Sequence, residues 1–203
     1  MGFVIVVALG LYLLISIGVV AWAINYAKKS GRSTMRWGWG AALGMYLLVF
    51  WDWIPTVVAH KYYCDTQAGF WVYKTPEQWK KENPGVMEAL VANKGYPSSH
   101  EGDMANYTNI NFLNQRFNLV YKHNGPLFLH RWRREDALVD TKTREVLARY
   151  VDFSTSQERR QAGWSGWKFW LDSEFWMGEG GYCNGNKAIE SVKWINQFRG
   201  VEK

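Results

Sequence analysis

Residues 49–64 read VFWDWIPTVVAHKYYC, and this stretch separates two unlike parts of the chain. The sequence before it is mostly apolar, whereas the sequence after it mixes charged, polar and aromatic residues as a globular domain does. Inside the stretch a lone carboxylate, Asp52, stands between two tryptophans, and Cys64 closes it. An apolar segment that ends in aromatic and polar residues is typical of a helix leaving a membrane. We therefore interpret residues 1–60 as a membrane anchor and residues 61–203 as a separate domain outside the bilayer.

The first predicted span covers residues 3–27, which carry no charge. At 1.5 Å per residue, a helix of this length is long enough to cross a hydrocarbon core. A cleaved signal peptide is the alternative, because Ala21, Trp22 and Ala23 resemble a cleavage site. The run is longer than a usual signal-peptide core and no basic segment precedes it, so we expect an uncleaved span.

The second predicted span covers residues 37–60. Its uninterrupted apolar part, residues 40–51, is too short to cross alone, so the span must either include Asp52 and Pro55 or be tilted or re-entrant. Pro55 is expected to kink the helix because it lacks a backbone donor. Asp52 then lies in the outer half of the membrane, where it either contacts a protein neighbour or ion path, or meets water where the bilayer thins.

Gly40 and Gly44 form a GxxxG pair in the second predicted span. Small residues at this spacing allow two helices to approach closely within a membrane. The expected neighbour is the first span of the same chain, and docking on another membrane protein is the alternative.

The connection between the two spans, residues 28–36, predicts the orientation of the anchor. It is expected to remain in the cytoplasm because basic loops do so. Both termini and the domain 61–203 would then lie outside, in the periplasm if the cell is a Gram-negative bacterium. Its four basic residues are Lys28, Lys29, Arg32 and Arg36.

The rest of the net charge of +6 is spread thinly and interleaved with acidic residues. A nucleic-acid-binding protein concentrates its basic residues on one face, so the sequence predicts no nucleic-acid partner.

The chain has two cysteines, Cys64 and Cys183. In an oxidising compartment such a pair is expected to form a disulfide, here tying the membrane-proximal end of the domain to its last helix. A metal site is not expected, because neither cysteine has a nearby partner at metal-ligand spacing. No cofactor is predicted.

The pattern of residues 61–203 predicts an α+β domain in which helices flank an antiparallel sheet. Thr75, Pro76 and Gln78 have the types and spacing of a capped helix start. A helix is also expected after Pro84, and a final one over 184–198. Strands are expected over 69–73, 111–121, 126–139 and 145–153, with a turn at Asn124-Gly125.

Tryptophan is unusually frequent, with 13 residues. We consider three uses for a late cluster of four: packing in the core, lying in the outer membrane interface, or lining a cleft that stacks on a ligand. The four residues are Trp164, Trp167, Trp170 and Trp176.

Residues 97–103, PSSHEGD, bring hydroxyl, imidazole and carboxylate groups together around His100. These are the groups of a nucleophilic hydrolase, but side chains adjacent in sequence diverge and do not normally form a triad. We interpret the segment as a solvated loop. His123 and His130 flank the predicted turn at Asn124-Gly125, and two imidazoles alone make a poor metal site.

The motifs WDWIP, KYYC, AGFWVYKT and LVDTKTREVLARY, with a late cysteine before a helix, resemble small uncharacterised bacterial inner-membrane proteins. In that pattern a short anchor leads to an exported α+β domain, and the resemblance implies no activity. The function expected first is a non-enzymatic accessory subunit of a larger inner-membrane complex, with lipid and that complex as partners. A periplasmic binding module for a small ligand, glycan or lipid is the second expectation, and a membrane-tethered hydrolase using His100 or His130 the third.

Overall fold

The computed structural model describes residues 2–95, 97–103, 105–157, 166–178, 181, 183 and 185–200. The chain forms two compact units, Met1–Pro55 and Thr56–Lys203. The first is helical and the second is a mixed α+β unit built on one antiparallel sheet.

Helix α1 (Gly2–Lys29) is long and apolar enough to cross a membrane, a property that signal sequences share. Among the described residues it is the one helix that meets this test alone. Helices α2 (Thr34–Phe50) and α3 (Trp53–Gln67) meet it only together, as a pair broken by a bend. The structure therefore shows one candidate span, and the predicted two-span hairpin is not shown.

The kink expected at Pro55 in the helix over 37–60 is a break, since α2 ends at Phe50, α3 begins at Trp53, and the two helices are bent by 59°. Pro55 explains the position of the break. Its ring excludes the carbonyl four residues earlier, that of Trp51, from the helical hydrogen-bond ladder. Asp52 lies in the break, and its side chain is fully buried.

The loop between α1 and α2 is shorter than predicted, since Lys28 and Lys29 belong to α1 and Arg36 to α2. The two helices contact each other through Tyr12, whose hydroxyl donates to the Met45 carbonyl.

The expected packing of Gly40 and Gly44 on the first span is also wrong. A Cβ atom at either position would meet nothing within 4 Å, whereas one at Gly38 would lie 3.1 Å from Ile24. The close approach therefore uses Gly38, and the GxxxG pair faces away from α1.

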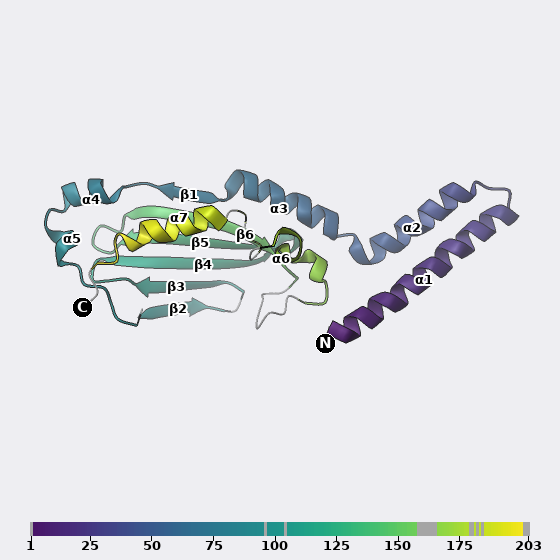
Figure 1. The fold of residues 1–203 in the computed structure, drawn as a ribbon, viewed down its shortest axis with the longest axis horizontal. Coiled ribbons are helices and arrows are strands. Elements are labelled where there is room, and N and C mark those ends of the chain that lie inside the picture. Colours follow the sequence, from purple (N-terminus) through teal and green to yellow (C-terminus); the bar gives the residue numbers. More distant parts are fainter. Residues whose placement is uncertain are drawn as a thin grey trace. The chain divides into compact units, whose positions relative to one another are not determined.

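The second unit contains a six-stranded sheet in which every neighbouring pair is antiparallel (Figure 1). The spatial order is β1-β6-β5-β4-β3-β2, so β2 to β6 form a meander and β1 adds to its far edge. The strands are β1 (Gly69–Val72), β2 (Ser98–Gly102), β3 (Tyr107–Phe112), β4 (Phe117–Leu127), β5 (Arg131–Asp140) and β6 (Val146–Thr155).

Short helices connect the strands, and a longer one packs on the sheet. Thr75 and Gln78 form the predicted capping box of the first, and Pro76 begins it. The helices are α4 (Pro76–Glu82), α5 (Val86–Ala89), α6 (Ser173–Met177) and α7 (Gly185–Asn196), with 3₁₀ turns η1 (Phe128–His130) and η2 (Phe169–Leu171).

Several strand predictions need correction. The segment 97–103, expected to be a loop, contains the edge strand β2. The single strand expected over 111–121 is the end of β3, a turn and the start of β4. The turn expected at Asn124-Gly125 lies within β4, and the chain reverses at η1 instead.

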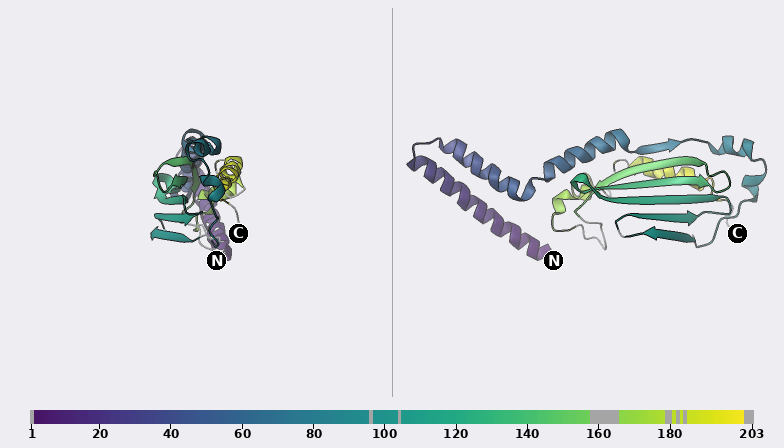
Figure 2. Two further views of the ribbon diagram at one scale, coloured as in Figure 1. Left: turned by 90° about the vertical axis from the view of Figure 1, so that its left-hand side faces the viewer. Right: turned by 180° about the vertical axis from the view of Figure 1, so that it is seen from behind.

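Helix α7 packs on one face of the sheet, while β2 and β3 extend beyond it (Figures 1 and 2). Because side chains alternate along a strand, Phe117, Leu119 and Leu138 share this face with Tyr121 and His123. We call it the inner face. Its buried core contains Trp79, Met87, Leu90, Leu113, Phe117, Leu119, Leu138, Leu147, Ile195 and Phe198.

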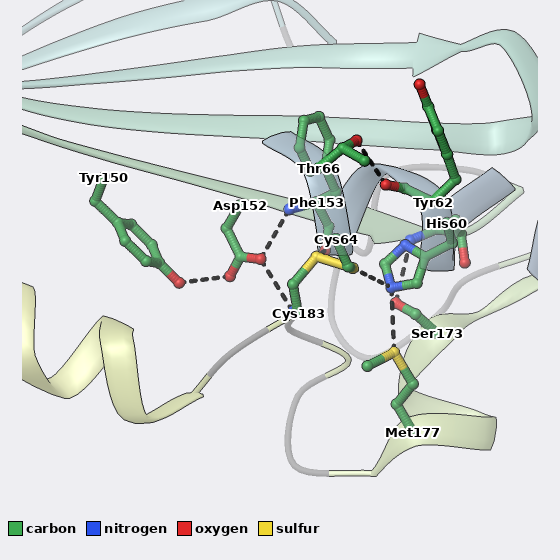
Figure 3. The surroundings of a disulfide bond; sticks show 11 residues. His60, Tyr62, Cys64, Thr66, Tyr150, Asp152, Phe153, Ser173, Met177 and Cys183 are labelled. Carbon is green, nitrogen blue, oxygen red and sulfur yellow. Dashed lines mark hydrogen bonds between the residues drawn. A yellow bond between two sulfur atoms is a disulfide. The ribbon is translucent and has the colours of Figure 1, made fainter. Parts of the chain in front are cut away.

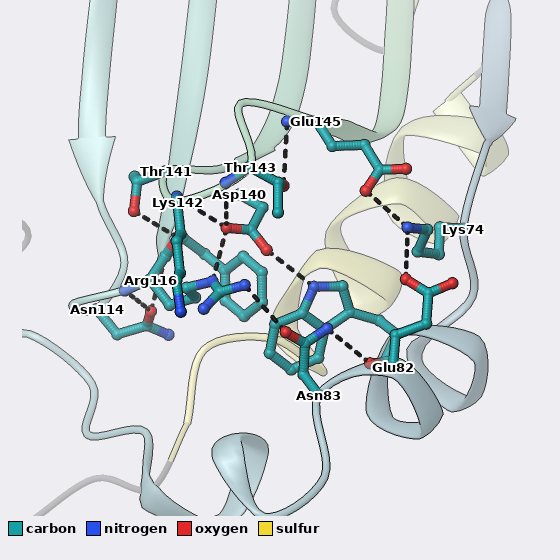
Figure 4. A network of polar contacts seen from close by, with 12 residues as sticks. Lys74, Glu82, Asn83, Asn114, Arg116, Asp140, Thr141, Lys142, Thr143 and Glu145 are labelled. Carbon is teal, nitrogen blue, oxygen red and sulfur yellow. Dashed lines mark hydrogen bonds and ion pairs between the residues drawn. The ribbon is translucent and has the colours of Figure 1, made fainter.

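A polar network holds the end of the sheet next to α4 (Figure 4). The buried carboxylate of Asp140 accepts hydrogen bonds from Arg116 Nε at 2.6 Å and from Trp79 Nε1 at 3.0 Å. Nearby, Lys74 Nζ contacts Glu82 at 2.8 Å and Glu145 at 2.6 Å. These contacts join α4, the turn before β4 and the turn before β6.

Candidate functional site

A cavity of 460 Å³ opens on the inner face, at the end of the strands away from Phe117 and Leu119. The side chains of β4 show how it arises: the inner positions are apolar at Phe117 and Leu119, then become Tyr121 and His123. The same change occurs on β5, where the inner positions are Leu138 in the core and then Asp136 and Arg134 toward the cavity. The inner face therefore carries a packed core at one end and a cavity lined by polar and aromatic side chains at the other.

A row of aromatic rings crosses the sheet at this cavity. His100 of β2 lies 5.4 Å from Tyr107 of β3, measured between ring centroids. Tyr107 stacks on His123 of β4 at 5.3 Å, and His123 stacks on Trp132 of β5 at 5.6 Å. The last three line the cavity and offer ring faces to a ligand.

Trp132 is held in one orientation. Its ring lies against Gly125, where an added Cβ atom would come within 2.5 Å of the indole. Its Nε1 donates to the Ser156 carbonyl at 3.1 Å. Glycine is thus required opposite the indole, because any larger residue would displace the ring.

Amide and charged side chains supply the polar part of the lining. Asn109 and Asn111 project from β3, and Arg134 from β5. Arg134 forms a two-point contact with Asp136, its Nε and Nη2 donating at 2.9 and 2.6 Å. This pairing fixes the orientation of the Arg134 guanidinium in the cavity lining.

Two carboxylates at the cavity are buried: Asp152, which lines it, and Asp136, which is paired with the lining residue Arg134. Burial raises the pKa of Asp136, and the Arg134 guanidinium offsets this only in part. Burial also raises the pKa of Asp152, although it accepts hydrogen bonds from the Tyr150 hydroxyl at 2.6 Å and from the Cys183 amide at 3.0 Å. Burial, followed by the contact with Asp152, raises the pKa of Tyr150. Titratable groups with shifted pKa values beside a cavity are typical of functional sites.

The disulfide is connected to this cavity through Asp152, which lines the cavity and accepts a hydrogen bond from the Cys183 backbone amide (Figure 3). The predicted bond between Cys64 and Cys183 is present. His60, one helical turn before Cys64, is 1% exposed and places Nε2 3.3 Å from Cys64 Sγ and 3.1 Å from Met177 Sδ. The spacing His-x-x-x-Cys was a signal in the sequence, and our sequence analysis missed it.

Three of the four tryptophans singled out from the sequence are described, and none of these three lines the cavity. Trp170 is 2% exposed and packs in the unit, whereas Trp167 is 45% exposed and meets Trp170 edge to face at 5.5 Å. Trp176 meets the His60 ring at 5.1 Å. Trp164 lies outside the described residues. Trp132, which sequence reasoning did not select, is the tryptophan in the described cavity lining.

Among the described residues, the hydrogen-bond partner of His100 is an amide and not the carboxylate that a hydrolase would need. Its Nδ1 lies 3.2 Å from Asn109 Oδ1, and its ring lies against Tyr107. Ser98 to Gly102 are exposed along the edge strand. The arrangement suits stacking and hydrogen bonding to a bound molecule.

Comparison of the chain with known families, with curated proteins and with solved structures finds no match. The resemblance to small bacterial inner-membrane proteins therefore stays a prediction.

Proposed function

We propose that this protein is a membrane-anchored binding module whose second unit binds a short glycan in the inner-face cavity. The observation that carries the proposal is the row of rings at Tyr107, His123 and Trp132 beside the amides of Asn109 and Asn111. Ring faces pack against the apolar faces of sugars, and amides hydrogen-bond to hydroxyl and acetamido groups. A cavity of 460 Å³ is within the usual size range of small-molecule sites.

The proposed location is the outer side of a bacterial inner membrane. Helix α1 would be the first crossing, and α2 with the start of α3 the second, with the basic connection inside. The Cys64–Cys183 disulfide supports this orientation, because such bonds persist in oxidising compartments. A glycan-binding module in the periplasm has cell-wall fragments within reach as ligands.

Isothermal titration calorimetry of the full chain in nanodiscs tests the glycan site, with chitotriose and a muropeptide as probes. We expect at least one probe to bind in the millimolar range or tighter. Tyr107→Ala should weaken binding about 10-fold, since the loss of one ring contact is worth about 1.4 kcal/mol. Tyr73→Ala is the matched control, because Tyr73 is 58% exposed and lines the opposite face beside Arg149. Absence of binding by both probes, or equal losses in the two variants, would contradict the proposal.

An accessory role in a larger membrane complex is the second candidate. It is favoured by Gly40 and Gly44, whose surface is open among the described residues. A GxxxG face that does not pack within the chain is suited to another membrane helix.

Replacing both glycines is expected to abolish that docking. Gly40→Val/Gly44→Val should shift the mildly solubilised protein from a larger complex to the free chain in native gels. Gly10→Val/Gly18→Val is the matched control, since these glycines of α1 also have open surroundings. A wild-type chain that migrates alone would contradict the accessory role and leave the glycan proposal unaffected.

A further inference from the structure

The corner around the disulfide gathers four soft or borderline donor atoms (Figure 3). The ring nitrogen of His60 and the sulfurs of Cys64 and Cys183 all lie within 4.8 Å of one another. Met177 Sδ lies 3.1 Å from His60 Nε2. The donors come from α3, from the end of α6 and from the connection before α7, so the tertiary fold brings them together.

We propose that the reduced form of this corner binds one monovalent copper ion. Its ligands would be the thiolates of Cys64 and Cys183, the imidazole of His60 and the thioether of Met177. Thiolate and thioether ligands select Cu(I), and imidazole also suits copper. Zinc is the less suitable ion because its protein ligands are thiolate, imidazole and carboxylate, and thioether is not among them.

The spacing of the donors fits a shared ion. Ligands held about 2.0–2.3 Å from one metal ion lie about 3.3–3.8 Å from each other. His60 Nε2 lies 3.3 Å from Cys64 Sγ and 3.1 Å from Met177 Sδ, close to that range before any movement. The two cysteine sulfurs are the exception, because they are bonded to each other. Reduction removes that bond and lets the sulfurs separate to ligand spacing.

The environment of His60 also points to a ligand. The ring is 1% exposed, and its Nδ1 has no hydrogen-bond partner among the described residues. Its Nε2 contacts the sulfur atoms of Cys64 and Met177, which are weak hydrogen-bond partners. A buried imidazole with so little hydrogen bonding is costly to the fold. Coordination of copper through Nε2 would use its lone pair, and the Trp176 ring packs edge to face on the imidazole, with 5.1 Å between ring centroids.

The chemistry requires a dithiol reductant. Thiol–disulfide exchange breaks the bond between Cys64 and Cys183, gives two protein thiols, and converts the dithiol into its own disulfide. Binding of one Cu(I) ion then displaces one proton from each thiol, because the ligand is the thiolate. The oxidised chain offers no thiolate at this corner, so copper binding is confined to the reduced state.

Competition with the chelator bicinchoninate tests the proposal on the full chain in detergent, reduced without oxygen by a phosphine that is then removed. We expect the reduced chain to take one Cu(I) ion from the chelator and to release two protons, and the oxidised chain to take none. His60→Ala and Met177→Leu should each weaken binding on the order of 10-fold or more. His100→Ala and Met35→Leu are matched controls, because both residues are exposed and lie outside the corner.

Two results would overturn the inference. One is a reduced chain that leaves the copper on the chelator or prefers Zn²⁺ to Cu(I). The other is binding in the His60 and Met177 variants as tight as in wild type. The second result would also reveal a site formed by two thiols of an unfolded chain, since such a site does not need the other two ligands.

Discussion

Cys64→Ser/Cys183→Ser is expected to lose about 4–5 kcal/mol of unfolding free energy. The disulfide joins residues separated by 119 positions. Closing so long a loop removes much conformational entropy from the unfolded chain, and the stabilisation grows with loop length. Native-state strain subtracts from this value, so it is an upper figure.

The effect should concentrate at α7. Cys183 lies two residues before this helix, and its backbone amide donates to Asp152 at 3.0 Å. Ile195 of α7 and Phe198 beyond it complete the core beside Trp79. Without the covalent link, the start of α7 is held to the sheet by non-covalent contacts such as this hydrogen bond. Faster amide exchange in α7 than in β4 and β5 would locate the loss there.

Urea unfolding of the full chain, followed by far-ultraviolet circular dichroism, measures the change. The wild-type protein under a phosphine reductant is the matched control, because it breaks the same bond without altering the sequence. A loss below about 1 kcal/mol in both samples would contradict the chain-entropy argument. Two free thiols in the native wild-type protein would contradict the bond itself.

The parts of the fold that the sequence predicted correctly rest on local or pairwise signals. The capping box of Thr75 and Gln78 lies within four residues, and α7 follows from the spacing of its apolar residues. The disulfide followed from there being one possible pair. Each signal is complete without knowledge of the tertiary structure.

The errors have a common physical cause in exposure and in long-range contact. Every residue of β2 is exposed, so this edge strand has no apolar alternation by which to find it. The turn at 113–116 lacks glycine and proline, and it is fixed by Asn114, whose side chain accepts from the Arg116 and Phe117 amides. The helix breaks at Trp51 and Asp52 and not at Pro55 itself, because a proline disrupts the helical turn that precedes it.

The cavity could not be predicted because it combines residues of four strands with Asp172 and Ser173. Tyr107, His123 and Trp132 meet only once the register of β3, β4 and β5 is set. Only part of the disulfide corner could be predicted from the sequence. His60 and Cys64 share one helix face, but Met177 reaches them from α6 through the tertiary fold.

Asp140→Asn is expected to destabilise the second unit by about 3–5 kcal/mol near neutral pH. Its carboxylate is fully buried and accepts from the Arg116 guanidinium, the Trp79 indole, and the Lys142 and Thr143 amides (Figure 4). Asparagine keeps one oxygen acceptor but removes the negative charge. Arg116, whose side chain is 12% exposed, would then be left as a nearly buried cation without its counter-ion.

The loss should depend on pH with a defined sign. Burial opposes ionisation of Asp140, but the hydrogen bonds from Arg116 and Trp79 outweigh it, so its pKa in the folded chain lies below the ordinary value of 3.8. The stabilisation is therefore fully present above pH 3.8 and is lost as the pH falls through the folded-state pKa. The difference in urea midpoint between wild type and Asp140→Asn should shrink in that acidic window.

Asp136→Asn is the matched control on the same strand, because burial raises the pKa of Asp136 above 3.8. Its stabilising contribution is present below pH 3.8 and is lost as the pH rises through the folded-state pKa, the opposite sign to Asp140. Wild type should therefore lose stability relative to Asp136→Asn as the pH rises above 3.8, while it gains relative to Asp140→Asn as the pH rises toward 3.8. Urea midpoints measured from pH 3 to pH 8 that run parallel for all three proteins would show that neither buried carboxylate changes its pKa on folding.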